Sequence, residues 1–284
     1  MHNELFSIGP LHFHMYGLMT AVGIICAYLV LVFRSGKAKR KGFHQEDIIK
    51  LIIFCLVFGY LGSKILYLLT ILPQIIEDPS LILRSITDGW VIFGGILGGM
   101  FGGWLFCKLS HRDAGVYFDM AFPSVALAQG FGRLGCFFAG CCYGMPTTGP
   151  IAIVFKNSDY APNNVPLVPT QLISSALDFL LFAFLLLYER FFQKKNGELA
   201  AWYLILYSFG RFVLEFWRGD LERGAVGSLS TSQFISLFTF AFGIILLIYI
   251  RRKGVPVTMV TSEDEKSGSE EEMKAEKPEE NSEA

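Results

Sequence analysis

The stretch YGLMTAVGIICAYLVLVF, from Tyr16 to Phe33, decides the fold because none of its side chains is charged. A helix of about 20 such residues crosses a hydrocarbon layer roughly 30 Å thick. Similar apolar runs recur through the 284 residues, of which 52% are hydrophobic, and the mean hydropathy is +0.46. The sequence therefore predicts an all-α protein that crosses a membrane several times.

Seven transmembrane helices are predicted, at about 13–34, 47–72, 90–109, 115–141, 170–190, 199–217 and 230–250. The segments that follow the first, third, fifth and seventh helices carry most of the Lys and Arg residues. By the positive-inside rule, the N-terminus lies outside and the C-terminus in the cytoplasm. The N-terminal segment lacks the basic residues of a cleaved signal peptide, so the first helix is expected to remain in the mature protein.

The chain is expected to divide into a membrane domain, residues 1–254, and an acidic cytoplasmic tail, residues 255–284. The tail has almost no large apolar side chain from Thr261 onward and is predicted to be disordered. Two external segments are expected to cover the outer face. Ile71 to Gly89 is predicted to lie along the interface as an arm, and Met145 to Pro169 to form a loop or short hairpin.

Glycine pairs recur every four residues in FGGILGGMFGGW, within the third predicted helix. This spacing places them in one stripe where another helix backbone can approach closely. From Gly98 onward the stripe favours a helix–helix seam. For Gly94 and Gly95, close contact with a lipid headgroup is an equal alternative.

Ionisable side chains inside the predicted helices cost roughly 2.5–3.5 kcal/mol each and normally face a cavity or a partner. Five such residues stand out: Lys64, Asp119, Arg133, Arg211 and Glu215. Asp119 is interpreted as an anion at a helix N-terminus. Lys64 either joins the other cations or reaches the interface with its flexible stem.

Arg211 and Glu215 lie four residues apart, which predicts an ion pair on one helix face. Arg218 adds a second cation to that face, and Arg133 adds a third from the fourth helix. Cations in excess of nearby carboxylates favour a bound anion, and the planar fork of arginine suits the phosphate of a phospholipid. The alternative is structural pairing or snorkelling.

The three cysteines of GRLGCFFAGCCYG have the spacing C-x4-C-C, with no fourth Cys or His close by. This argues against a zinc site, and the five histidines form no ligand pair, so no metal site is expected. For Cys136, Cys141 and Cys142 three interpretations remain open: packing of small apolar side chains, a structural disulfide, or a reactive thiol.

Several stretches together resemble one family, the prolipoprotein diacylglyceryl transferases, which are seven-span enzymes of the bacterial inner membrane. The resemblance covers almost the whole chain apart from the acidic tail. Six stretches carry it, in order: HMYGLMTAVG, FGYLGSKILYLL, FGGILGG, GRLGCFFAGCCYG, PTQL and GRFVLEFWRGD.

The resemblance implies transfer of diacylglyceryl from phosphatidylglycerol to the lipobox cysteine of a prelipoprotein signal peptide, releasing glycerol 1-phosphate. This is the first step of bacterial lipoprotein maturation. The resemblance implies catalytic roles for Arg133, Arg211 and Glu215, the arginines holding the phosphodiester and stabilising the leaving phosphate. A monomer in contact with membrane lipid is expected, with no cofactor, metal or nucleic acid. Substrate contacts are implied at Tyr16, Gly17, Lys64, Gly94, Gly95, Gly144, Gln171 and Arg218.

The chain also departs from the family pattern. Phe93 replaces a histidine often proposed as a base, Cys136 and Ala139 replace two asparagines, and Cys141 replaces a glutamate. Lys64 stands where arginine is common. If a base is required, Glu215 or an activated water must serve. Three alternatives therefore stay open: a relative with another acceptor, a non-catalytic lipid- or anion-binding protein or transporter, and a thiol-redox protein.

Overall fold

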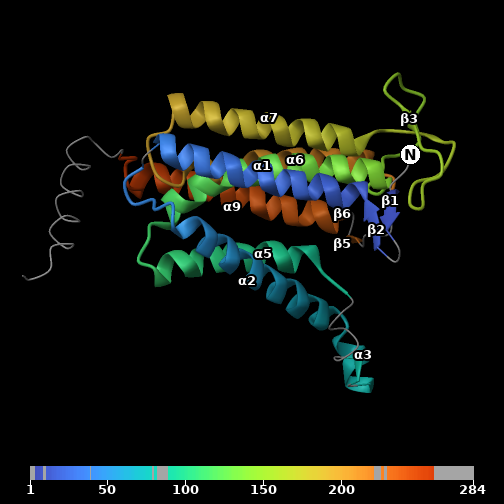
Figure 1. Cartoon of the computed structure of the whole chain (residues 1–284), viewed down its shortest axis with the longest axis horizontal. Coiled ribbons are helices and arrows are strands. Elements are labelled where there is room, and N and C mark those ends of the chain that lie inside the picture. Colours follow the sequence, from blue (N-terminus) through green and yellow to red (C-terminus); the bar gives the residue numbers. More distant parts are fainter. Residues whose placement is uncertain are drawn as a thin grey trace, which may run out of the picture.

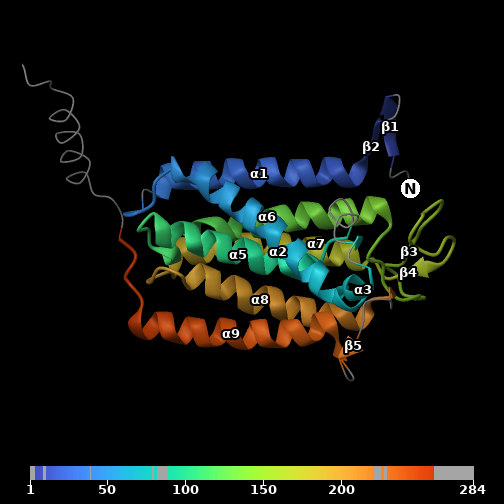
Figure 2. The same cartoon turned by 90° about the horizontal axis from the view of Figure 1, so that it is seen from below.

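The computed structural model describes residues 4–8, 11–38, 40–78, 80–81, 89–220, 225–226 and 229–258. Long helices dominate this part of the chain and run side by side (Figures 1 and 2). They are α1 (Met15–Ala38), α2 (Asp47–Thr70), α5 (Ile92–Leu109), α6 (Ala114–Ala139), α7 (Thr170–Phe191), α8 (Glu198–Leu214) and α9 (Thr231–Lys253).

Short elements lie mainly at one end of the bundle. Helix α3 (Leu72–Glu77) follows α2, and a single turn of 3-10 helix, η1 (Glu215–Trp217), extends α8. Three small antiparallel sheets pair β1 (Glu4–Ile8) with β2 (Leu11–His14), β3 (Ile153–Val154) with β4 (Pro166–Leu167), and β5 (Ala225–Val226) with β6 (Leu229–Ser230).

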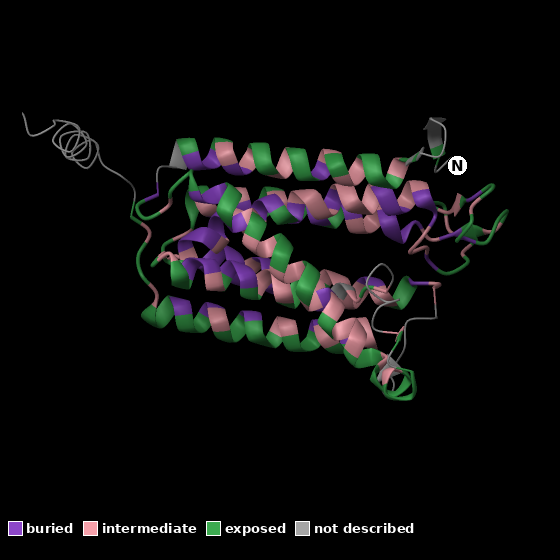
Figure 3. Ribbon diagram, turned by 60° about the horizontal axis from the view of Figure 1, so that its bottom comes forward, coloured by how far each residue is buried: buried purple, intermediate pink, exposed green. Residues whose placement is uncertain are grey.

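Five helices of the described chain are long and apolar enough to cross a membrane: α1, α2, α7, α8 with η1, and α9. Helix α5 is a shorter apolar helix, and α6 is long but carries Asp119 and Arg133. Exposed residues recur along the bundle (Figure 3), and many are large and apolar, including Leu29, Leu180 and Ile245. A bilayer accommodates such a surface, whereas water does not. The predicted multi-pass helical membrane protein is therefore confirmed.

The predicted hairpin between Met145 and Pro169 is confirmed by the pairing of β3 with β4. The arm predicted from Ile71 to Gly89 contains the short helix α3, and its residues 82–88 lie outside the described residues. Residues 259–284 of the predicted tail also lie outside them. Residues 255–258 pair with the rest of the chain, because Val257 donates its N–H to Lys194 and Lys41 donates to Thr258, both at 3.0 Å.

Helices α2 and α5 pack with their backbones in contact along the glycine stripe. A Cβ atom added at Gly94 would overlap the carbonyl oxygen of Gly62, and one at Gly98 would overlap that of Phe58. The predicted seam is therefore confirmed, and it includes Gly94. A Cβ at Gly99, by contrast, would meet the Cys55 carbonyl oxygen at an ordinary 3.5 Å.

Helix α6 lies at the centre of the bundle, where it packs against α1, α5, α7 and α8. At its N-terminal end the buried carboxylate of Asp119 accepts hydrogen bonds from the backbone N–H groups of Gly197 (2.7 Å) and Leu199 (2.9 Å). The guanidinium of Arg40 lies 3.4 Å from the same carboxylate. Asp119 is therefore an anion at a helix N-terminus, as predicted. The helix whose N–H groups it accepts from is α8, whereas the prediction placed it at the start of its own helix.

The glycine seam yields a stability prediction. Gly98→Ala is expected to lower the free energy of unfolding by about 1–3 kcal/mol, because the new methyl group forces two backbones apart. Gly99→Ala is the matched control and is expected to change stability little. The stability of both variants is measured by heating them in detergent and recording the loss of monodisperse protein. Equal stability of the two variants would contradict close backbone packing at Gly98.

Candidate functional site

Three of the predicted cations, Arg133, Arg211 and Arg218, lie at the end of the bundle where α6 and α8 finish and α7 and α9 begin (Figure 2). We call this end the site end. On α8 and η1, Arg211 Nη2 lies 2.8 Å from Glu215 Oε2, so the predicted ion pair is confirmed. Arg218 Nε lies 4.0 Å from the same oxygen. Ser230, at the start of α9, donates to Glu215 Oε1 at 3.0 Å. Glu215 therefore ties two arginines to the neighbouring helix.

Arg133 reaches the same site from α6. It interacts electrostatically with Arg211, and both arginines interact with the carboxylate of Asp178 on α7. The two side chains that the sequence placed on separate helices therefore share one environment. Within the described residues Arg133 forms no hydrogen bond or ion pair, and Arg211 Nη1 is buried without a hydrogen-bond partner. A buried donor such as Arg211 Nη1 is costly unless a ligand takes it.

Asp178 was missed by the sequence analysis. It is only 4% exposed, and its Oδ2 has no hydrogen-bond partner among the described residues. The signal was available, since an isolated acid in the apolar run SALDFLLF satisfies the same criterion that selected Arg133. Asp178 and Asp220 also change the charge balance. The predicted excess of cations is wrong, because Arg133, Arg211 and Arg218 face the carboxylates of Asp178, Glu215 and Asp220.

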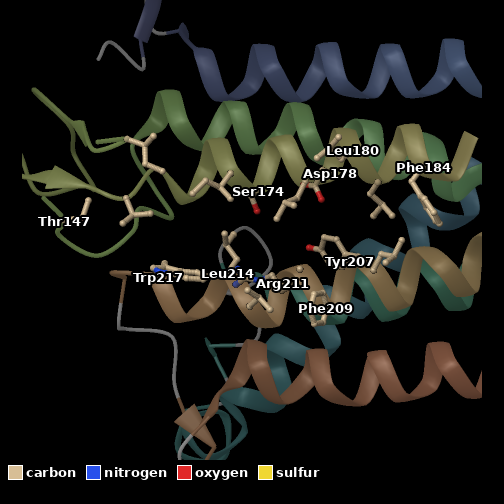
Figure 4. Close-up of a pocket in the computed structure, with 18 residues that line it drawn as sticks. Thr147, Ser174, Asp178, Leu180, Phe184, Tyr207, Phe209, Arg211, Leu214 and Trp217 are labelled. Atoms are coloured by element: carbon tan, nitrogen blue, oxygen red, sulfur yellow. The ribbon is translucent and has the colours of Figure 1, made fainter. Parts of the chain in front are cut away.

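A cavity of about 760 Å³ lies between α7 and α8 beneath the 145–168 loop (Figure 4). Asp178 and Tyr207 point toward one another across it, and Arg211 lines it from α8. The remaining wall is mainly apolar and includes Leu180 and Phe209, which are 65% and 59% exposed. The cavity therefore combines a charged part with an apolar part that opens sideways between the helices.

The signature stretch turns sharply after α6. Gly140 has φ +76°, and the N–H of Cys141 donates to the carbonyl of Cys136 at 3.2 Å, which is a Schellman ending. Cys142 is also left-handed, with φ +61°. Two side chains from the start of α7 hold this turn: Thr170 Oγ1 donates to the Cys142 carbonyl at 2.9 Å, and Gln171 Nε2 donates to the Cys141 carbonyl at 2.8 Å.

Gly144 connects this turn to two other segments. Its N–H donates to the Val168 carbonyl at 3.1 Å, and it forms a β-bridge with Arg218. A Cβ atom at Gly144 would overlap the Val168 carbonyl oxygen, so only glycine fits. Arg218 forms two hydrogen bonds with Asp220, at 2.8 and 2.6 Å. Burial alone would lower the pKa of Arg218, but its hydrogen bonds to Asp220 and to the Cys142 thiol raise that pKa overall, and the guanidinium stays charged.

The other predicted substrate contacts are dispersed. Tyr16 is 46% exposed at the start of α1 and interacts electrostatically with Arg133 and the three thiols. The adjacent Gly17 has open space where a Cβ would be. Lys64 Nζ donates to the Gly89 carbonyl at 3.1 Å and lies 3.9 Å from the Trp90 ring centre. Gly94 lies in the seam with α2, and a Cβ at its neighbour Gly95 would lie 3.6 Å from the Gly59 carbonyl oxygen.

Comparison with known proteins assigns this arrangement to a family. The sequence pattern described as prolipoprotein diacylglyceryl transferase matches residues 3–249. The chain is 47% identical over 240 residues to the phosphatidylglycerol–prolipoprotein diacylglyceryl transferase of Clostridium tetani, covering 84% of this chain and 94% of that protein. It is 44% identical over 245 residues to transferase 2 of Clostridium perfringens, covering 86% and 93%. It is 30% identical over 256 residues to the Staphylococcus carnosus transferase, covering 88% and 91%.

The contacts of the signature turn predict the effect of an isosteric substitution. Thr170→Val keeps the side-chain shape but leaves the Cys142 carbonyl without the hydroxyl donor, which is expected to cost about 1–3 kcal/mol of stability. The exposed Thr148→Val serves as the matched control and is expected to be neutral. Thermal unfolding in detergent measures the difference. A Thr170→Val protein as stable as the control would show that the hydroxyl does not hold the turn.

Proposed function

Because the chain belongs to the prolipoprotein diacylglyceryl transferase family, we propose that it transfers diacylglyceryl from phosphatidylglycerol to the lipobox cysteine of prelipoproteins. The observation that carries the proposal is the convergence of Arg133 and Arg211 from two helices. Arg133 has no hydrogen-bond partner among the described residues, and Arg211 Nη1 has none either, although Arg211 Nη2 donates to Ser232 at 3.2 Å. A phosphodiester fits these donors, because arginine presents a planar fork to phosphate oxygens.

In the proposed reaction the lipobox sulfur forms a bond to the terminal glyceryl carbon of the donor. The bond between that carbon and the phosphate oxygen breaks, and glycerol 1-phosphate leaves with the electron pair. Arg133 and Arg211 stabilise the charge that grows on the leaving phosphate. Glu215 fixes Arg211 through their 2.8 Å ion pair and so belongs to the catalytic group. Asp178 has a carboxylate oxygen without a hydrogen-bond partner in the described chain and is suited to accept the thiol proton.

The cavity accounts for the lipid part of the donor. Its apolar wall is suited to acyl chains, and its charged part, at Asp178 and Arg211, to the headgroup. Exposed wall residues such as Leu180 support entry of the lipid from the side, between α7 and α8. Tyr16 and Arg218, which interact with the turn after α6, are proposed to line the route of the signal peptide.

We further propose that α5 and α6 also cross the bilayer, giving seven spans in the bacterial inner membrane. Basic side chains at the end opposite the site end support a cytoplasmic location for that end. They include Arg34, Arg40, Arg112, Lys194 and Arg251. The N-terminus and the site then face outward, where secreted prelipoproteins emerge. We also propose that the protein acts as a monomer.

Conservative arginine variants test the proposed chemistry. Arg133→Lys and Arg211→Lys are each expected to lower the transfer rate by about 10²–10³-fold, because lysine keeps the charge but loses the preorganised fork. Arg190→Lys, an exposed position on α7, is the matched control and keeps full activity. Membranes carrying each protein, phosphatidylglycerol and a lipobox peptide are assayed for lipidated peptide and glycerol 1-phosphate. Absence of both products with the folded natural protein would overturn the proposed function.

Filling the cavity tests where the lipid binds. Gly210 lines the cavity, and its side-chain position lies 3.8 Å from Leu177. Gly210→Leu is expected to raise the mole fraction of phosphatidylglycerol needed for half-maximal rate by about tenfold, which corresponds to about 1.4 kcal/mol. Gly210→Ala is expected to have a small effect. Kinetics in mixed micelles provide the measurement, and equal values for both variants would exclude this cavity as the donor site.

A further inference from the structure

The three cysteines of the signature stretch form a compact cluster at the site end. The sulfur atoms of Cys136, Cys141 and Cys142 all lie within 4.8 Å of one another. A Schellman ending brings the side chains of its first and sixth residues together, here Cys136 and Cys141. The left-handed backbone of Cys142, with φ +61°, then turns the third thiol back toward the other two. A non-glycine residue in that conformation is uncommon and is often found at functional sites.

The sulfur separations suit one metal ion. Zinc–sulfur bonds of about 2.3 Å place the sulfur atoms of a tetrahedral or trigonal site roughly 3.8–4.0 Å apart. The cluster needs only a small contraction to reach that spacing. A disulfide, by comparison, would use two of the three thiols and would require an oxidant.

The backbone that carries the thiols is held in place before any ion binds. Thr170 and Gln171 donate to the carbonyls of Cys142 and Cys141, and both side chains are almost fully buried. Outer hydrogen bonds of this kind orient metal ligands and strengthen binding. The turn is therefore a preorganised support for the thiols rather than a loose loop.

The surrounding charges also suit a thiolate–metal centre. Three thiolates around a divalent cation carry a net charge of −1. The Arg218 guanidinium is hydrogen-bonded to the Cys142 thiol, and Arg133 interacts electrostatically with Cys136 and Cys142. These cations offset the negative charge that a centre of three thiolates and one divalent cation would carry.

We propose that Cys136, Cys141 and Cys142 bind a zinc ion and leave its fourth coordination position open. The lack of a nearby fourth Cys or His, which argues against a closed structural site, is typical of a catalytic zinc site with three protein ligands. Resting on the proposed function, we assign the open position to the lipobox thiol of the acceptor. Metal binding releases the three cysteine protons to solvent. The incoming thiol gives its proton to Asp178, the acceptor in the proposed reaction, as its sulfur coordinates, and no oxidation state changes.

A metal titration tests the site without measuring transfer. The full-length protein, reduced and stripped of metal in detergent, is titrated with Cd²⁺ while the ultraviolet charge-transfer band of cadmium thiolates is recorded. Zinc content after equilibration with Zn²⁺ is measured in parallel. We expect one ion per chain, and at least a 100-fold loss of affinity in Cys136→Ser, Cys141→Ser and Cys142→Ser. Cys26→Ser and Cys107→Ser, on α1 and α5, are matched controls with unchanged binding.

Several results would overturn the site: no thiolate band in the natural protein, equal binding by variants and natural protein, or oxidation of two cluster thiols that excludes the metal.

Addition of a lipobox peptide tests the open position. A cysteine peptide is expected to increase the cadmium band, and a serine peptide is not. A cysteine peptide without effect would overturn the acceptor role. Intact metal binding in a protein that releases no glycerol 1-phosphate would refute the proposed transferase but not the metal site.

Discussion

The structure depends on a partly buried positive charge at the site end of an apolar bundle. Arg133 lies on α6, the helix that packs against α1, α5, α7 and α8, and its side chain is partly buried among them. Removing such a charge from water costs several kcal/mol. Asp178 on α7 offsets part of that cost across the helix interface. Arg211 Nη1, which has no hydrogen-bond partner among the described residues, is the donor that the proposed phosphate ligand would take.

One end of the bundle holds the contacts that stabilise the fold, and the other holds the candidate site. At the N-terminal end of α6, Asp119 joins α6 to the start of α8, and apolar residues such as Leu185 and Leu199 close the contact between α7 and α8. Near Arg211, a cavity lies between the same two helices. The contact between α7 and α8 is therefore packed at one end and leaves space at the other.

Apolar run length predicted the helices well, because a backbone in lipid must satisfy its hydrogen bonds within each helix. Spacing along one helix likewise predicted the ion pair of Arg211 and Glu215. Asp178 could be recognised as unusual from the sequence, but its position opposite two arginines depends on the rotation of α7. The thiol cluster depends on left-handed φ angles at Gly140 and Cys142, and these backbone angles cannot be predicted from the spacing of apolar residues.

If the proposed donor lipid occupies the cavity, the sideways opening between α7 and α8 means that the protein supplies only part of the wall around that lipid. Leu180 and Phe209 border the opening, and the surrounding amphiphile forms the rest. The host bilayer is thus a structural component of the binding site. Chain length and packing of the neighbouring lipids enter the affinity for the donor directly, so a constant measured in one micelle or membrane belongs to that medium as much as to the polypeptide.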